Sequence, residues 1–178
     1  MTTHPSLFHR DCGILLHPSS LPNGYGIGDF GPASHRWLQW LADTGQSLWQ
    51  ILPLNPVGYG ESPYQGLSAF AASPLFLSPE ALFEAGLLSR AELEGLRLPC
   101  ADRVDYEAVV ANRSQLIRGL VQTFAGLPED HELRRAYARF RVREADWLED
   151  FALFAAIKEA QGGVAWTHWP EPLRDRQP

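Results

Sequence analysis

The sequence predicts an α/β fold in which a parallel βαβ unit is followed by a mostly helical part. Two short apolar runs, Gly13–His17 and Leu48–Leu54, flank a segment whose apolar residues repeat at helical spacing. Strand, helix and strand in this order imply that the two strands pair in parallel. From Pro79 onward the periodicity is helical, so the second half of the chain should contain few strands or none.

The first strand should end at Pro18, and its continuous apolar character is typical of a strand that is buried on both faces. A loop rich in Gly and Pro follows from Leu21 to Pro32, and loops of this kind at strand ends often carry function. A helix is expected from Pro32 until Gly45 ends it. The tryptophans of this region are assigned to the core: Trp37, Trp40 and Trp49.

The loop contains a G-x-G-x-x-G pattern from Gly26 to Gly31, which raises the possibility of a dinucleotide site. Such glycines should follow the strand directly, yet Pro18 and Pro22 intervene, and no Asp or Glu follows the second strand to hold a ribose. We therefore interpret these glycines as turn residues.

After a second long loop, Asn55–Pro79, every expected element is a helix. The expected helices are Pro79–Ala85, Ser89–Leu96, Tyr106 to about Phe124, and a long stretch whose periodic apolar residues run from Leu133 to Phe154 and which ends at Gly162-Gly163. This long stretch should break near Arg143. Five arginines between Arg134 and Arg143 are flanked by acids, which favours a solvated face with ion pairs over a phosphate site.

Charge and composition exclude several function classes. With 15 Lys and Arg against 21 Asp and Glu, the net charge of −6 gives no attraction to nucleic acid or to an anionic membrane. Cys12 and Cys100 stand apart without metal-ligand spacing, so we expect no disulfide framework, no metal site and a reducing compartment. No apolar run approaches the ~20 residues that cross a bilayer. These features predict a cytoplasmic protein.

Two residue groups are candidates for a site. His17 stands at a strand end without a visible partner, and a hydrogen-bonded histidine is favoured there over a general base. The second loop carries Tyr59 and Tyr64 among Pro, Gly, Ser and Gln, at the carboxyl end of a strand, where parallel-sheet proteins bind ligands. Tyrosine rings flanked by polar groups suit the binding of a sugar ring, but it is an equally good interpretation that these tyrosines only pack the loop.

Several multi-residue motifs follow one another in a fixed order along the chain. They lie in Arg10–Gly31 (Gly-Ile-Leu-Leu-His-Pro-Ser-Ser-Leu-Pro and Tyr-Gly-Ile-Gly), Leu48–Leu54, the Tyr/Gly/Ser/Pro/Tyr/Gln loop, Arg103–Tyr106, Trp147–Phe154 and Gly162–Pro170. In this order they resemble the motifs of the 4-alpha-glucanotransferase family, also called amylomaltases or disproportionating enzymes. The resemblance covers the chain from about Leu7 to Leu173.

The resemblance implies a retaining transglycosylase on a (β/α)8 TIM barrel, which transfers α-1,4-glucan segments between glucans by double displacement. A closed barrel needs roughly 200 residues or more, and this chain has 178. We therefore expect an incomplete barrel. Residues 1–54 form its first βαβ part, residues 55–165 a loop and helical insertion beside the active-site cleft, and residues 166–178 the start of the return to the barrel.

The same resemblance implies no catalytic residue within this chain, because the family carries its nucleophile Asp and acid/base Glu on later strands, beyond Pro178. It assigns substrate contacts instead: Tyr64 stacks beside the cleaved bond, with Ser62 and Gln65 near the same subsite. Tyr59 and Tyr106 line a second glucan-binding groove. No cofactor is implied.

The expected partners are α-1,4-glucans, such as maltooligosaccharides and amylose, and the missing C-terminal part of the barrel. Two strands cannot make a stable sheet, so we expect the segment to be marginally stable, to oligomerise or to dock onto that part. It should be inactive alone. The alternative is a free-standing glucan-binding or interaction module without chemistry.

Overall fold

The computed structural model describes residues 11–99 and 102–177, and Cys100 lies outside them. The chain divides into two compact units, which are residues 1–67 with 72–126 (unit 1) and residues 68–71 with 127–178 (unit 2). The expected boundaries at residues 54 and 165 concern a barrel and its insertion, and they stay a prediction.

The two expected strands pair in parallel, as predicted. Strand β1 (Gly13–Leu15) and strand β2 (Leu48–Gln50) are in register with Ile14 opposite Trp49, and they form the sheet found in the described residues. Both strands are shorter than expected. The prediction that they are buried on both faces is wrong for this chain, because Leu15 and Leu48 are more than half exposed. No described element covers these side chains.

The expected helix is α1 (Pro32–Asp43), and Gly45 follows it with a φ of 73°. Trp37 packs on Trp40 with ring centroids 5.0 Å apart, and its ring meets that of Trp49 at 6.5 Å. The assignment of all three tryptophans to the core is wrong for Trp40, which is 48% exposed. Trp37 and Trp49 are half-buried. The Trp49 indole donates to the Leu16 carbonyl, which joins β2 to the end of β1.

The Gly- and Pro-rich loop after η1 (Pro18–Ser20) is packed into the fold, and its expected functional role stays a prediction. Tyr25, Ile27 and Asp29 in this loop are each no more than 3% exposed. A Cβ atom at Gly28 would lie 2.0 Å from the Pro18 carbonyl oxygen, so only glycine fits there. The loop glycines therefore serve close backbone packing, in agreement with their interpretation as turn residues.

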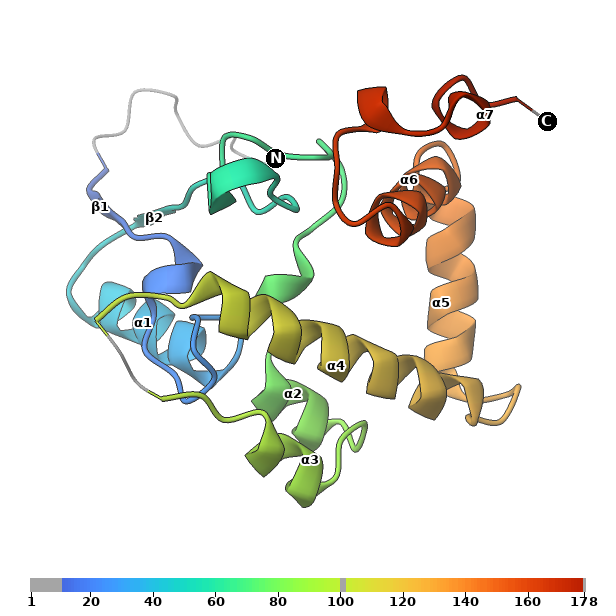
Figure 1. The fold of residues 1–178 in the computed structure, drawn as a ribbon. Helices are drawn as coiled ribbons and strands as arrows, with labels where there is room; N and C mark the ends of the chain where they lie inside the picture. The colour runs from blue at the N-terminus through green and yellow to red at the C-terminus, as the bar shows by residue number, and fades with distance from the viewer. Residues whose placement is uncertain (1–10, 100–101, 178) are drawn as a thin grey trace, which may run out of the picture. The chain divides into compact units, whose positions relative to one another are not determined.

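The α-helices of unit 1 that follow α1 begin at residues whose side chains cap them. They are α2 (Pro79–Glu84), α3 (Arg90–Gly95) and α4 (Tyr106–Ala125), and Figure 1 shows α2 and α3 side by side against α4. Ser78, Ser89 and Asp105 each accept a hydrogen bond from a first-turn backbone N–H group. The core between these helices consists of Tyr25, Leu88, Leu93, Leu96 and Leu116. Tyr25 thus anchors the first loop in the helical core.

Unit 2 is helical, and its long periodic stretch breaks at Arg143 as predicted. Helix α5 (Glu132–Arg143) is followed by α6 (Leu148–Ala160), and Trp147 at the break donates its indole N–H to Glu144. A short helix η4 (Trp166–His168) and helix α7 (Glu171–Arg174) complete the unit. The expected ion pairs are present for Arg141 with Glu149 and for Arg143 with Glu144.

Aromatic side chains make a continuous row through unit 2. Phe70 stacks on Trp147, and consecutive contacts then lead through Phe151 and Phe154 to Trp169, with ring centroids 5.5 to 6.4 Å apart. This row fixes α6 against the segment that follows it. Among the described helices of both units, none is long and apolar enough to span a membrane.

Candidate functional site

The second loop contains a short hairpin beyond the carboxyl end of β2. Val57 and Gly66 form an antiparallel bridge, the Gly58 N–H donates to the Gln65 carbonyl at 3.0 Å, and the Leu67 N–H donates to the Pro56 carbonyl at 2.8 Å. The Ser73 N–H donates to the Leu54 carbonyl, which ties the far end of the loop back to its start. Ligands of parallel sheets bind beyond the carboxyl ends of the strands, so this hairpin lies where a binding loop is expected.

The hairpin tip has an unusual backbone. Helix η2 (Tyr59–Glu61) contains Gly60 with a φ of 71° and Glu61 with a φ of 53°. The left-handed conformation costs a residue with a Cβ atom about 1–2 kcal/mol, and such strain concentrates at functional sites. Glu61 is therefore held by its surroundings in a conformation that its own backbone disfavours.

The structure places Ser62, Tyr64 and Gln65 together on this hairpin. Tyr64 is 74% exposed, Gln65 is exposed and Ser62 is half-buried, with its carbonyl oxygen accepting from the Gln65 N–H. A ring that is three-quarters exposed contributes little to the packing of the loop, so it is available as a flat apolar face. The role of these three residues in stacking and binding a sugar stays a prediction.

Tyr106, the first residue of α4, lies close to the same hairpin. It lines a small cavity of about 30 Å³ together with His17, Ser19, Asn55 and Glu61. Burial raises the pKa of Tyr106, the Glu61 charge raises it further, and a hydrogen bond with the Ser19 side chain opposes both effects. Burial also raises the pKa of Glu61.

The structure therefore brings Tyr106 next to Glu61, two residues after Tyr59 in η2. The side chain of Tyr59 itself lies outside the described part of the chain, so the pairing of Tyr59 with Tyr106 stays a prediction. Glu61 was not among the predicted site residues. It is the only acid of the second loop in the sequence, but that feature alone does not indicate a role.

His17 forms another wall of the small cavity. Its ring meets Phe76, from η3 (Pro74–Phe76), edge-on at 5.3 Å. Burial lowers the pKa of His17, and within residues 11–99 and 102–177 its Nδ1 atom is buried without a hydrogen-bond partner. The hydrogen bond expected of this histidine is therefore not found at Nδ1, and the neutral imidazole is favoured.

A larger groove of about 570 Å³ also has Tyr106 in its wall. It runs between the first loop and the segment before α4, and its volume lies within the range of small-molecule sites. Its walls are Ser19–Asn23, Gly26–Gly28, Pro99 and Asp102–Val104, with Tyr106 at one edge. Tyr106 thus lines both the small cavity at the hairpin and this groove.

A buried polar network fixes the first loop beside this groove. Asp29 accepts hydrogen bonds from the Gly31 N–H at 2.8 Å and from the Asn23 carboxamide at 2.9 Å, and it faces Arg113 of α4. Burial raises the pKa of Asp29, although its hydrogen bonds and the Arg113 charge act to lower it. Burial lowers the pKa of Arg113. Both carboxylate oxygens of Asp29 are thus used within the fold. Sequence reasoning missed the pair, because nothing local connects the two residues.

Metal ligation finds no support in the geometry. Within residues 11–99 and 102–177, no group of three or more His, Cys, Asp or Glu side chains is arranged to hold a metal ion. Cys12 is free and exposed. The described side chains at the hairpin and the small cavity include aromatic rings, hydroxyl and carboxamide groups and the half-buried carboxyl group of Glu61.

These features define an α/β protein with an exposed aromatic hairpin beyond the carboxyl end of a parallel strand. A family model described as 4-alpha-glucanotransferase matches residues 16–178. The 4-alpha-glucanotransferase of Thermus thermophilus is 45% identical over 170 residues, which cover 94% of this chain and 33% of that protein. The enzyme of the same name from Synechocystis is 43% identical over 171 residues, which cover 95% of this chain and 33% of that protein.

Solved structures agree with the sequence matches. An amylomaltase from Streptococcus agalactiae, in complex with acarbose, superposes with a TM-score of 0.85 at 32% identity, covering 96% of this chain and 34% of that one. The chain belongs to the 4-alpha-glucanotransferase family. It spans about a third of the length of the curated relatives that it matches.

Proposed function

We propose that this chain is the N-terminal part of a 4-alpha-glucanotransferase and supplies walls of its glucan-binding cleft. The observation that carries the proposal is the hairpin beyond β2, on which Tyr64 is 74% exposed beside Ser62 and Gln65. The apolar face of a glucosyl ring stacks on the Tyr64 ring, while the hydroxyl and carboxamide groups bind its hydroxyl edge. Tyr59 and Tyr106 line a second groove for the same glucan.

The reaction we propose is the retaining transfer of α-1,4-glucan segments, with its two carboxylates on barrel strands beyond Pro178. A retaining mechanism needs a nucleophilic carboxylate and an acid/base carboxyl group about 5–5.5 Å apart. Asp29 is buried and uses both oxygens within the fold, and Glu61 lines a hollow of about 30 Å³. Neither is proposed as a catalytic group, so we expect this chain alone to be inactive. No cofactor is proposed, because the carboxylate pair of a retaining mechanism carries out this chemistry unaided.

The strand surfaces of unit 1 are consistent with an incomplete (β/α)8 barrel. Leu15 and Leu48 are 55% and 56% exposed, and Ile51 beyond β2 is 36% exposed. In a closed barrel such side chains are packed against neighbouring strands and helices. We propose that the remaining barrel docks on this surface. Residues 1–54 are then its first βαβ part and residues 55–165 the insertion beside the cleft.

The test is an NMR titration of the chain with maltotetraose that follows the backbone amides of residues 57–66. We expect saturable shifts at residues 62–65, and about a tenfold higher Kd for Tyr64→Ala. Tyr137→Ala on α5, which removes a half-exposed tyrosine of unit 2, is the matched control and should leave these shifts unchanged. Hairpin amides that do not respond to maltotetraose would contradict the proposed binding role.

A free-standing glucan-binding module is the second candidate. It is favoured by one observation: the hairpin, Tyr106 and the groove all lie within unit 1. Both candidates predict glucan binding. They differ in whether adding the rest of a barrel produces transfer activity.

A further inference from the structure

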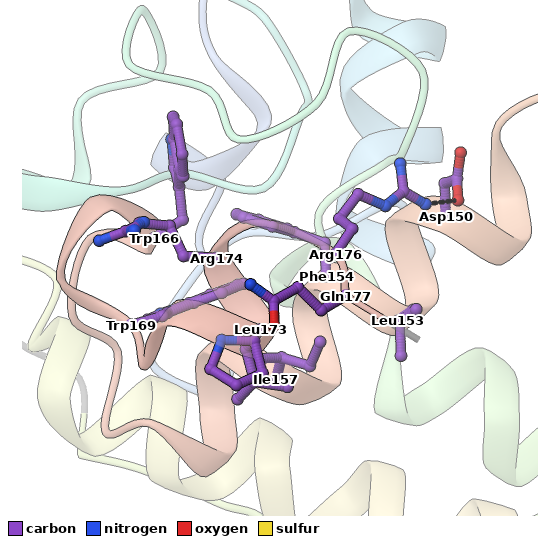
Figure 2. A pocket seen from close by; sticks show the side chains of 11 residues that line it. Asp150, Leu153, Phe154, Ile157, Trp166, Trp169, Leu173, Arg174, Arg176 and Gln177 are labelled. Atoms are coloured by element: carbon purple, nitrogen blue, oxygen red, sulfur yellow. Dashed lines mark hydrogen bonds and ion pairs between the residues drawn. The ribbon is translucent and has the colours of Figure 1, made fainter.

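Unit 2 contains a cavity of its own, of about 610 Å³, which no part of the proposed function uses. Its volume lies within the range of small-molecule sites. Figure 2 shows Trp166 and Arg174 at one end and the pair of Asp150 and Arg176 at the other. Between them lie apolar side chains of α6 and α7, among them Phe154, Ile157 and Leu173.

One wall of the cavity is aromatic and held in place. Trp169 is 6% exposed, its indole donates to the Val164 carbonyl at 3.3 Å, and its ring lies 5.5 Å from that of Phe154. Trp166, three residues earlier, is 54% exposed. A fixed indole thus supports the wall, and a second indole offers an open apolar face to a ligand.

The polar groups around the cavity carry no excess charge. Arg176 donates to Asp150 at 2.6 Å, and Arg174 donates to both oxygens of Asp175 at 2.7 and 3.0 Å. Because each guanidinium already faces a carboxylate, an anionic ligand gains little attraction here. Gln177 adds a carboxamide that both donates and accepts.

We propose that this cavity binds a neutral pyranose ring, and specifically a glucosyl unit of an α-1,4-glucan. A pyranose has an apolar C–H face, which Trp166 matches, and an edge of vicinal hydroxyl groups. The planar ends of Asp150, Arg176 and Gln177 supply the donors and acceptors that such an edge requires. The preference for a neutral polyhydroxyl ring follows from the cavity, whereas the choice of a glucan rests on the proposed function.

The consequence is an additional point of attachment for a long glucan, besides the hairpin and the groove beside Tyr106. Polymers present many identical units, and a further weak site raises overall retention without altering the other sites. Short maltooligosaccharides occupy each site separately. The cavity therefore adds to polymer binding while the hairpin remains the primary site.

The test follows the indole N–H resonances of the six tryptophans in the full chain by NMR. The Trp166 resonance is identified by its loss in Trp166→Phe. We expect maltotetraose to shift this resonance in a saturable manner, and Gln177→Ala to raise the corresponding Kd several-fold. Sorbitol has hydroxyl groups but no ring face, so it should leave the resonance in place. Tyr64→Ala should leave the Trp166 response unchanged.

Two outcomes overturn the inference. One is a Trp166 resonance that stays fixed at saturating maltotetraose, and the other is an equal response to sorbitol, since either excludes recognition of a pyranose face. The hairpin amides report on the proposed function in the same titration. A response there without one at Trp166 rejects only this cavity as a sugar site, and the reverse pattern rejects only the hairpin.

Discussion

The guanidinium of Arg113 and the carboxylate of Asp29 form a buried ion pair, with 4.0 Å between Arg113 Nη2 and Asp29 Oδ2. Their side chains are 1% and 4% exposed. At this distance the charges attract but do not share a hydrogen bond, and Arg113 donates instead to the Leu75 carbonyl and to Asn112. The pair joins the first loop to α4, the helix that begins at Tyr106. It is therefore part of what positions the groove beside Tyr106.

Breaking this pair should strongly destabilise the chain. Arg113→Met leaves the Asp29 carboxylate buried without an opposite charge, and removing one partner of a buried pair costs about 3–5 kcal/mol. The double variant Asp29→Asn with Arg113→Met removes both charges and should lose less than the sum of the two single variants. Urea unfolding of the three variants measures this. A loss below about 1 kcal/mol for Arg113→Met would show that the pair does not hold the loop.

Two glycine substitutions of opposite expected effect test the packing of the first loop. Gly28→Ala places a methyl group within 2.6 Å of the carbonyl oxygens of Pro18 and Leu21, so we expect a loss of about 3 kcal/mol. Gly119→Ala in α4 meets nothing within 4 Å and should stabilise the helix by about 0.5–1 kcal/mol. Thermal unfolding compares them. Equal effects of the two substitutions would contradict the close packing at Gly28.

Glu61 should make stability depend on pH. Burial raises its pKa above the ordinary value of 4.5, so the folded chain holds this proton to a higher pH than the unfolded chain does. The stabilisation from Glu61 is complete below pH 4.5 and is lost as the pH rises through the raised value. Glu61→Gln should therefore flatten the fall of Tm with pH above 4.5. A slope identical in the two proteins would contradict a buried carboxyl group at the hairpin tip.

Local patterns predicted the secondary structure well. Pro32 and Gly45 bounded α1, and the charged break at Arg143 separated α5 from α6. The short apolar runs predicted parallel pairing because that inference needs only order and spacing. Burial was predicted less well: Trp40 and Leu15 read as core residues, yet they are about half exposed, since no described element covers them.

The site was predictable only where its residues are neighbours in the chain. Ser62, Tyr64 and Gln65 share a hairpin, so their grouping followed from the sequence. Asp29 and Arg113 meet from distant segments, and no periodicity connects them. Glu61 is defined by a left-handed φ and by burial against Tyr106, and neither can be read from residue types.

Complementation most directly tests the central claim that this chain is the N-terminal part of a 4-alpha-glucanotransferase and that its catalytic carboxylates lie on the rest of the barrel. The chain is mixed with a polypeptide that comprises the part of the Thermus thermophilus relative beyond the third matched here, and products from maltotriose are followed. We expect no transfer from either polypeptide alone, glucose and longer maltooligosaccharides from the mixture, and a lower rate with Tyr64→Ala. Transfer by this chain alone, or a stable complex of the two polypeptides that remains inactive, would contradict the account.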